Sequence, residues 1–295
     1  MLRFKTPQTL GLWLHKERLS TLHGQQGLIS HVEPVAYVQG KSWQFGERPK
    51  KGEKALWLFS DAEFPLAAFF RWHLERIYPL KKTTVVLVTN AQNRGISGNL
   101  WQDIFRDMPL VKVEQWQPVD ILSAVHVQQQ SGLLLYCEDG LAHLRVVQKG
   151  QVIESLQLGY GRYISREIRQ RFHEQYGIYL ALHTADSAWR KLSRPEVEQV
   201  TLEGQRQGAS GSQLLLKEEL HAIVLRALEP LAQEIHLLQQ AYDLPCLWLM
   251  GPQQGLTGLT ETLQRVFRAK IERGAASSSA FLSVFQQYLH RFRSS

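Results

Sequence analysis

The chain has 295 residues, of which 44% are hydrophobic and 21% charged, a composition ordinary for a soluble globular protein of one large unit or two domains. No apolar run approaches the ~20 residues that cross a bilayer, and the opening MLRFKTPQT lacks the apolar stretch of a secretory signal, so we expect a cytoplasmic protein. The net charge of +7 is compatible with contact to lipid headgroups or nucleic acid, and equally with mild basicity without a specific partner.

Segments rich in apolar and β-branched residues predict eight strands. Two of them, at 83–90 (TTVVLVTN) and 246–251 (CLWLMG), are nearly unbroken apolar runs, which are typical of central parallel strands covered on both faces. The others lie at 10–14, 35–40, 54–59, 111–116, 132–137 and 142–148.

The hairpin predicted at 10–23 (LGLWLHKERLSTLH) has an unusual turn. His15, Lys16, Glu17 and Arg18 separate its two apolar strands. Tight hairpin turns favour Gly, Asn or Asp because their backbone must reach positive φ. This turn contains none of them, which indicates that it does not serve the purpose of a Gly-rich loop.

Helical periodicity fills the intervals between the strands. The longest pattern, at 217–242, contains Pro230, so we expect a kink there. Strands that alternate with helices predict an α/β architecture. The other predicted helices lie at 64–78, 98–108, 119–129, 162–176, 257–269 and 278–292.

The two cysteines, Cys137 and Cys246, each lie in an apolar run. This placement favours buried, reduced thiols over a disulfide. The sequence has no G-x-x-x-x-G-K-[ST], no H-E-x-x-H and no G-x-S-x-G motif. It also lacks an aromatic-basic repeat for single-stranded nucleic acid. We therefore predict no metal site, no catalytic residue and no nucleic-acid partner.

Both halves of the chain open in a similar way. Residues 10–30 and 132–155 each contain an apolar strand, a polar turn, a second strand, a Gly-containing turn and a third strand. This pattern favours internal duplication of a unit somewhat over ~100 residues long, although two hairpins can resemble each other by chance.

A duplicated unit of this kind resembles the MreB-type bacterial actins of the actin/Hsp70 superfamily. The similarity runs almost end to end and lies in pattern more than in identity. Residues 10–38 are similar to the opening D-L-G-T-A-N-T and the later E-P-S-V-V-A, and 133–147 to the hairpin D-I-G-G-G-T-T-E-V. Residues 83–90, 156–168, 227–235 and 247–263 are similar to R-V-L-V-C-V-P, R-I-G-G-D-R-F-D-E-A-I, a long-helix segment ending in E-P-L, and V-L-T-G-G-G-A-L-L-R-N-L-D-R-L.

The resemblance implies an α/β, actin-like (ribonuclease H-like) duplicated two-domain fold with an interdomain cleft. Domain I would comprise residues 1–130 and 276–295, with a small subdomain at about 31–57. Domain II would comprise residues 131–275, with a small subdomain at about 166–215.

The chain departs from the family's nucleotide motifs at most positions. At the two hairpins, Trp13 and Tyr136 replace aspartates, and His15 replaces the turn glycine of the first. In the second hairpin Gly140 remains, but Glu138 and Asp139 replace two glycines.

The adenosine loop and two further motifs are altered as well. Gly251 remains in the loop, with Pro252 and Gln253 in place of the next two glycines. Gln117 follows Trp116 where a hydrolytic Glu precedes a proline in the family, and Asp186–Trp189 stands where the family has E-R-I-K.

These replacements predict a pseudo-ATPase without a cofactor. Glycines let backbone N–H groups converge on a phosphate, and residues with a Cβ disfavour that geometry. Carboxylates at 138 and 139 would face the phosphates at a cost of roughly 4 kcal/mol for a like-charge pair at ~4 Å, and no aspartate at 13 or 136 is left to hold Mg²⁺. We also hypothesise that Trp13, Trp116, Tyr136 and Trp189 fill the vacated site; the alternative is that they pack within their own domains.

The predicted function is that of a non-catalytic scaffold, which assembles with itself, with another actin-like protein or with a membrane complex in cell-shape or envelope organisation. The alternatives are a divergent ATP-binding filament former and a platform of a pilus or secretion machine. Apolar residues near Lys and Arg predict contact with an anionic membrane surface, against an ordinary terminus and loop. They are Met1, Leu2, Phe4, Tyr78 and Leu80.

Overall fold

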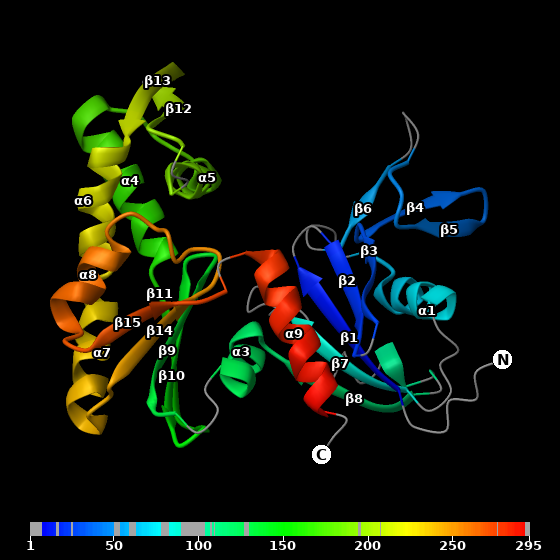
Figure 1. Cartoon of the computed structure of the whole chain (residues 1–295). Coiled ribbons are helices and arrows are strands. Elements are labelled where there is room, and N and C mark those ends of the chain that lie inside the picture. Colours follow the sequence, from blue (N-terminus) through cyan, green and yellow to red (C-terminus); the bar gives the residue numbers. More distant parts are fainter. Residues whose placement is uncertain are drawn as a thin grey trace. The chain divides into compact units, whose positions relative to one another are not determined.

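A computed structural model describes most of the chain and divides it into two compact units. Unit 1 comprises Met1–Val125 and Phe281–Ser295, and unit 2 comprises His126–Ala280. Each contains a five-stranded sheet (Figure 1), and each is described by itself. The described residues are 8–15, 18–24, 26–49, 54–58, 63–77, 83–89, 104–106, 108, 110–126, 130–193, 196–206, 208–275 and 277–292.

The sheet of unit 1 has the strand order β3-β2-β1-β7-β8. β1 pairs antiparallel with β2 and parallel with β7, so hairpin and crossover connections are combined in one sheet. The five strands are β1 (Gln8–His15), β2 (Arg18–His23), β3 (Gly27–Val32), β7 (Thr83–Thr89) and β8 (Leu110–Trp116). A small sheet is formed by β4 (Val35–Gln39), β5 (Ser42–Phe45) and β6 (Leu56–Trp57), and the helices are α1 (Leu66–Ile77), α3 (Pro118–His126) and α9 (Ser278–Phe292).

β1 presents alternate residues to two different helices. Leu10, Leu12 and Leu14 are fully buried and share a hydrophobic core with Phe69 and Phe70 of α1. The residues between them face the other way, because successive side chains of a strand point to opposite faces. A strand buried on both faces in this manner accounts for the apolar run in the sequence.

The opposite face of β1 packs against α9. A Cβ added to Gly11 would lie 2.6 Å from side-chain atoms of Phe285 and Leu289, so a larger residue there would force α9 side chains to move. Trp13 is 3% exposed, and its ring centroid lies 4.7 Å from that of Phe281. The residue that replaces an aspartate in the resemblance is therefore part of the core of unit 1.

The sheet of unit 2 has the order β11-β10-β9-β14-β15, and the two-stranded ribbon β12-β13 stands apart from it (Figure 1). The strands are β9 (Gly132–Glu138), β10 (Leu141–Gln148), β11 (Gln151–Gly159), β12 (Gln199–Arg206), β13 (Ala209–Leu216), β14 (Cys246–Met250) and β15 (Lys270–Arg273). The helices are α4 (Gly161–Tyr176), α5 (Leu182–Leu192), α6 (Lys217–Ala227), α7 (Glu229–Tyr242) and α8 (Leu259–Val266).

One face of the unit 2 sheet forms a single core with the helices. Leu133, Leu135 and Cys137 of β9 are fully buried in the same cluster as Ile168 of α4 and Val224 of α6. The highly charged pattern at 162–176 forms α4 as predicted, with its apolar stripe turned into this core. The core holds the β9–β10 hairpin against the start of α4 and the last turn of α5.

Most predicted elements within the described residues are present, with three informative differences. The pattern at 217–242 forms two helices that meet at Leu228, because Pro230 in the first turn of α7 cannot donate to the preceding turn. The strand predicted at 54–59 is only the two-residue β6. The polar ribbon β12-β13 was not predicted, since it has little hydrophobic alternation.

Three further expectations concern the thiols, membrane-spanning helices and the helix predicted at 98–108. Both cysteines are free, with Cys137 buried and Cys246 half-buried. Within the described ranges, no helix combines the length and the apolar character that crossing a bilayer requires. The helix predicted at 98–108 lies largely outside the described residues.

The burial of Trp13 leads to a stability prediction. Replacing it by alanine should remove the contact with α9 and lower the free energy of unfolding by about 3–5 kcal/mol, as for other buried Trp→Ala changes. Urea denaturation followed by circular dichroism would measure the change. The control is Trp43→Ala in β5, which is 39% exposed and should cost far less. Equal losses in the two variants would contradict a core role for Trp13.

Candidate functional site

The candidate site is the turn of the β9–β10 hairpin in unit 2. It consists of Asp139 and Gly140, which have φ of 50° and 77°. Two successive positive φ angles are what a two-residue hairpin turn requires, and Asp-Gly is a favoured sequence for it. The corresponding turn of unit 1 contains Lys16 and Glu17, which lie outside the described residues.

Gly140 packs directly against the start of α4. Its carbonyl oxygen accepts hydrogen bonds from the N–H groups of Tyr160 and Gly161, both at 2.9 Å. A Cβ on Gly140 would lie 2.6 Å from the Cα of Gly161, and one on Gly161 would lie 2.8 Å from the Cα of Gly140. The segment at 159–161 (GYG) thus serves as a backbone-to-backbone contact between the turn and the helix.

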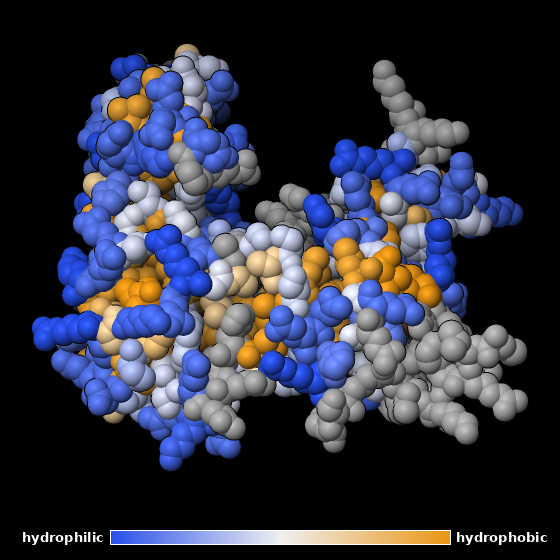
Figure 2. All heavy atoms as spheres, viewed as in Figure 1, coloured by the Kyte–Doolittle hydropathy of each residue, from blue (hydrophilic) through white to orange (hydrophobic). Residues whose placement is uncertain are grey.

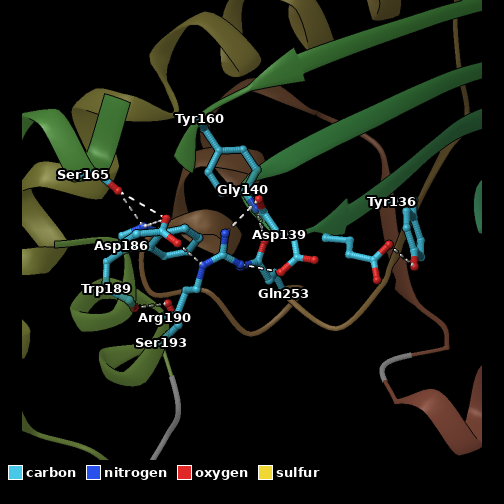
Figure 3. Close-up of polar contacts among 11 residues, drawn as sticks. Tyr136, Asp139, Gly140, Tyr160, Ser165, Asp186, Trp189, Arg190, Ser193 and Gln253 are labelled. Atoms are coloured by element: carbon cyan, nitrogen blue, oxygen red, sulfur yellow. Dashed lines mark hydrogen bonds and ion pairs between the residues drawn. The ribbon is translucent and has the colours of Figure 1, made fainter. Parts of the chain in front are cut away.

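The side chain of Gln253 closes the turn from the loop after β14. Its Oε1 accepts hydrogen bonds from the backbone N–H of Gly140 and from the hydroxyl of Tyr160, each at 2.7 Å (Figure 3). The Gln253 N–H donates to the carbonyl of Cys137 at 3.1 Å, which holds the loop in place. The Gly140 N–H is a donor that a turn can offer to an anion. Here it is already hydrogen-bonded to a neutral amide oxygen.

Gly251 allows the same loop to approach β9. Its φ is 97°, and an added Cβ would lie 2.4 Å from the carbonyl oxygen of Cys137. Its N–H donates to the carbonyl of Ala275 at 2.8 Å. The need for glycine at this position follows from packing alone.

Arg190 of α5 neutralises the carboxylate of the turn. Its Nη1 pairs with Asp139 Oδ1, its Nη2 donates to the Asp139 carbonyl at 3.2 Å, and its Nε donates to Asp186 at 2.8 Å (Figure 3). Asp186 lies one helical turn before Arg190, so α5 orients the guanidinium toward the hairpin. The pair is only partly exposed, which keeps water from competing for it.

Trp189 forms the buried floor of this network. It is fully buried, and its Nε1 donates to Ser165 and Asp186, both at 3.1 Å. The Arg190 guanidinium lies 4.9 Å from its ring centroid, within the range of a cation–π contact. Trp189, which stands at a nucleotide contact in the resemblance, therefore connects α5 to α4 in the interior of unit 2.

Glu138 does not point out of the turn. It is 6% exposed, and its Oε2 accepts a hydrogen bond from the hydroxyl of the buried Tyr136 at 3.1 Å. Burial, together with the nearby Asp139 charge, raises the pKa of Glu138 to about 8, against the smaller lowering effect of the Tyr136 hydrogen bond. The carboxyl is therefore mainly protonated at neutral pH, which differs from the expectation of two carboxylates facing a ligand.

These contacts determine which ligands suit the turn. The Gly140 N–H is engaged by Gln253, the Asp139 carboxylate by Arg190, and the Glu138 carboxyl is largely uncharged. Within the described part of the chain, no group of three His, Cys, Asp or Glu side chains is arranged to hold a metal ion. This arrangement does not fit a Mg²⁺-bound phosphate at the turn.

The structure brings together eight of the residues singled out in the sequence, all in unit 2, and places the others elsewhere. In unit 1, the Gln117 N–H donates to Asp120 at the start of α3, at 2.9 Å, and the ring of Trp116 lies 5.7 Å from Tyr288. His15 pairs with Arg18 in the β1–β2 ladder, and its side chain is not described. The eight that come together are Tyr136, Glu138, Asp139, Gly140, Asp186, Trp189, Gly251 and Gln253. The predicted membrane residues Met1, Leu2, Phe4, Tyr78 and Leu80 lie outside the described residues.

Sequence reasoning missed three members of the site, Arg190, Tyr160 and Ser165. One signal could have indicated Arg190: it follows Asp186 by four residues, which places both side chains on one helix face. No comparable signal distinguishes Tyr160 or Ser165 from ordinary helix-start residues.

The close contact at Gly140 predicts a large effect of a single methyl group. Gly140→Ala should destabilise unit 2 by about 2 kcal/mol or more, because it adds a clash to the cost of positive φ. The matched control is Gly177→Ala, since Gly177 has φ of 63° but nothing within 4 Å of an added Cβ. It should cost only about 1 kcal/mol. Equal thermal shifts of the two variants would contradict the packing argument.

The raised pKa of Glu138 predicts a pH-dependent stability. Between the ordinary value of 4.5 and about 8, the folded chain holds a proton that the unfolded chain has lost. Stability from this group is therefore complete below about pH 4.5 and is lost as the pH rises to 8, by up to ~1.4 kcal/mol per pH unit. Glu138→Gln has no carboxyl to titrate at this position. Its free energy of unfolding should therefore rise relative to that of the wild type as the pH increases.

The measurement is urea denaturation of both proteins between pH 6.5 and 8. This window avoids the effect of His73. Burial lowers the pKa of His73 from 6.5 to about 4, so its effect on stability changes only below about pH 6.5. A difference between Glu138→Gln and wild type that stays constant across the window would show that the carboxyl is already ionised.

Comparison with known proteins identifies the fold. No protein-family model matches the chain, and no curated protein matches its sequence. Solved structures do match: MreB5 of Spiroplasma citri bound to ADP has a TM-score of 0.69 and 12% identity, covering 98% of both chains. A MamK double helical filament has a TM-score of 0.64 and 11% identity, covering 98% of this chain and 99% of that one.

A third match is a non-polymerising MamK mutant bound to AMPPNP, with a TM-score of 0.60 and 13% identity, covering 99% of this chain and all of that one. MreB5 and MamK are bacterial actin-like proteins. The chain therefore has the actin-like, MreB-type α/β fold that the sequence predicts. Identities this low establish the fold and leave the activity to be argued from the site.

Proposed function

We propose that this chain is a non-catalytic actin-like scaffold, which acts by assembly with itself or with another actin-like protein and does not hydrolyse ATP. The observation that carries the proposal is the Gln253 amide, which takes the Gly140 N–H and the Tyr160 hydroxyl as donors. In the turn that would hold a phosphate in an actin-like protein, the Gly140 N–H is hydrogen-bonded to a side chain of the same chain.

The energetics of the turn support this proposal. A phosphate approaching the Gly140 N–H would have to displace Gln253, which forfeits two buried hydrogen bonds worth about 0.5–1.5 kcal/mol each. It would also approach the Asp139 carboxylate, which repels an anion unless Arg190 screens it. Since Arg190 is already bound to Asp139 and Asp186, its charge is compensated before any ligand arrives.

The alternative function is a divergent ATP-binding filament former. The similar structures of MreB5 and of the MamK mutant are described with ADP and AMPPNP bound. In that case Arg190 would have to leave Asp139 and bind a phosphate, and Gln253 would have to rotate away. Nucleotide affinity separates the two functions directly.

Assembly is the part of the proposal that draws on the similar structures. One of them is a double helical filament of MamK, and another is a MamK mutant named for its failure to polymerise. We extend the proposal to assembly at the inner membrane face, in cell-shape or envelope-complex organisation or in a pilus or secretion platform. That extension rests on the sequence pattern of the N-terminal residues and the segment at 77–82, and it remains a prediction.

The decisive experiment is calorimetric titration of the purified chain with Mg-ATP, beside sedimentation of the same protein with and without nucleotide. We expect no binding heat at millimolar ATP and assembly that does not depend on ATP. Gln253→Ala should lower the melting temperature without creating ATP binding, because the Asp139 carboxylate and its ion pair with Arg190 remain. MreB5 serves as the positive control. Micromolar binding coupled to ATP-dependent assembly would overturn the proposal in favour of the alternative.

A further inference from the structure

The net charge of the chain is confined to one unit. Residues 1–125 and 281–295 of unit 1 contain 18 Lys and Arg against 11 Asp and Glu, whereas residues 126–280 of unit 2 contain 16 of each. The entire +7 therefore belongs to unit 1. A net positive charge on that unit favours association with an acidic partner, including an acidic surface of another copy of the chain.

The outer face of α1 in unit 1 is hollowed along a helical stripe. A cavity of about 500 Å³ is lined by Ala67, Ala68, Arg71, Trp72, Glu75 and Arg76. These residues form two rows with a spacing of four, 67-71-75 and 68-72-76. Such rows make parallel ridges on a helix, and the groove between them can receive a ridge of a second helix. In Figure 2, hydrophobic spheres gather over the region where α1 and β3 lie in Figure 1, bordered by hydrophilic ones.

The floor and the rim of this groove differ in chemistry. Ala67 and Ala68 are exposed and small, so a second helix can approach closely, and Trp72 supplies an aromatic wall. Arg76 lies over the Trp72 ring at 5.0 Å, and Arg71 is exposed one helical turn before Glu75. The two arginines outnumber the exposed Glu75 at the rim, so the groove suits an aliphatic side chain flanked by a single carboxylate.

Helix α7 of unit 2 carries a matching surface. Leu237 is 56% exposed, and Gln233, Gln240 and Ala241 are exposed on the same face. Glu234 lies three residues before it, on the same face, and α7 contains no Lys or Arg. Glu229 at the start of the helix is paired with Arg265. At ~1.5 Å per residue, α7 and α1 are about 21 and 18 Å long, so the two helices match in length.

We propose that α7 of one copy docks into the α1 groove of another, with Leu237 in the hollow over Ala68 and Trp72 and with Glu234 between Arg71 and Arg76. This inference specifies the contact for the self-assembly in the proposed function and rests on it. The two surfaces are different patches of one chain, so the contact is heterologous, a kind that joins more than two copies into a ring or an open chain.

The size of the contact sets its strength. One helix against one helix covers less than the ~1,200–2,000 Å² of a stable interface. The association is therefore concentration-dependent, and it weakens with salt because Arg71, Arg76 and Glu234 lie at the solvent-exposed rim. No rearrangement of either helix is needed, since both surfaces are exposed in the described chain.

The test is sedimentation velocity of the full chain over a range of concentrations, with two single variants. Leu237→Asp removes the inserted side chain, and Ala68→Trp fills the hollow. Both positions are exposed, so folding should be unaffected, which circular dichroism verifies. We expect each variant to remain monomeric where the wild type assembles, with an association constant lowered about tenfold or more. The matched control is Leu182→Asp in α5, which is 52% exposed and should assemble as the wild type does.

Mixing the two variants gives the sharpest result. Leu237→Asp keeps an intact groove and Ala68→Trp keeps an intact α7, so together they should form a heterodimer that cannot grow further. A mixture that stays monomeric would overturn the inference, and so would unimpaired assembly of Leu237→Asp.

Two other outcomes assign a failure to its source. A wild-type chain that never assembles would reject self-assembly in the proposed function along with this contact, whereas assembly that is indifferent to both variants rejects this contact alone. Loss of binding to anionic vesicles by Ala68→Trp, with assembly unchanged, would show that the groove meets lipid and would also overturn the inference.

Discussion

A single backbone N–H group, that of Gly140, determines how the candidate site is built. In a two-residue turn this group points away from both strands, so the sheet cannot supply its acceptor, and a buried donor without a partner is costly. The chain meets this requirement with Gln253, whose amide oxygen lies 2.7 Å away. Gly251 then becomes necessary, because only a residue without a Cβ lets the loop that carries Gln253 reach β9.

The choice of an amide acceptor explains the charges around the turn. A phosphate carries negative charge and would exclude carboxylates from its surroundings, whereas a neutral amide does not. Asp139 and Glu138 are tolerated for that reason, provided that each finds its own compensation. Asp139 obtains it from Arg190, and Glu138 obtains it by holding a proton next to Tyr136. The substitutions in this hairpin thus form one consistent set, centred on an uncharged acceptor.

The fold could be predicted from the sequence because its signals are local. Apolar runs such as those of β7, β9 and β14 identify buried strands within a few residues, and Pro230 marks the helix break. The site could be predicted only in part. Gln253 is 113 residues from Gly140, and as a replacement for a glycine it looked like a loss of function, whereas the structure gives it two new hydrogen bonds. The partnership of Asp139 with Arg190 also depends on packing between distant helices, which no local pattern encodes.

The same network changes what can regulate such a molecule. A ligand that binds only the folded state stabilises it by about 4 kcal/mol at ~1,000 times its Kd, and that stabilisation varies with ligand concentration. The hydrogen bonds of Gln253 and the ion pair of Arg190 stabilise unit 2 at the turn where such a ligand would bind. Because these contacts lie within the chain, they do not vary with ligand concentration. Under the proposed function, unit 2 therefore has no bound and unbound states to alternate between. Assembly would then follow protein concentration, salt and the complementarity of exposed surfaces, which makes the charge confined to unit 1 and the exposed Leu237 of unit 2 the features on which regulation can act.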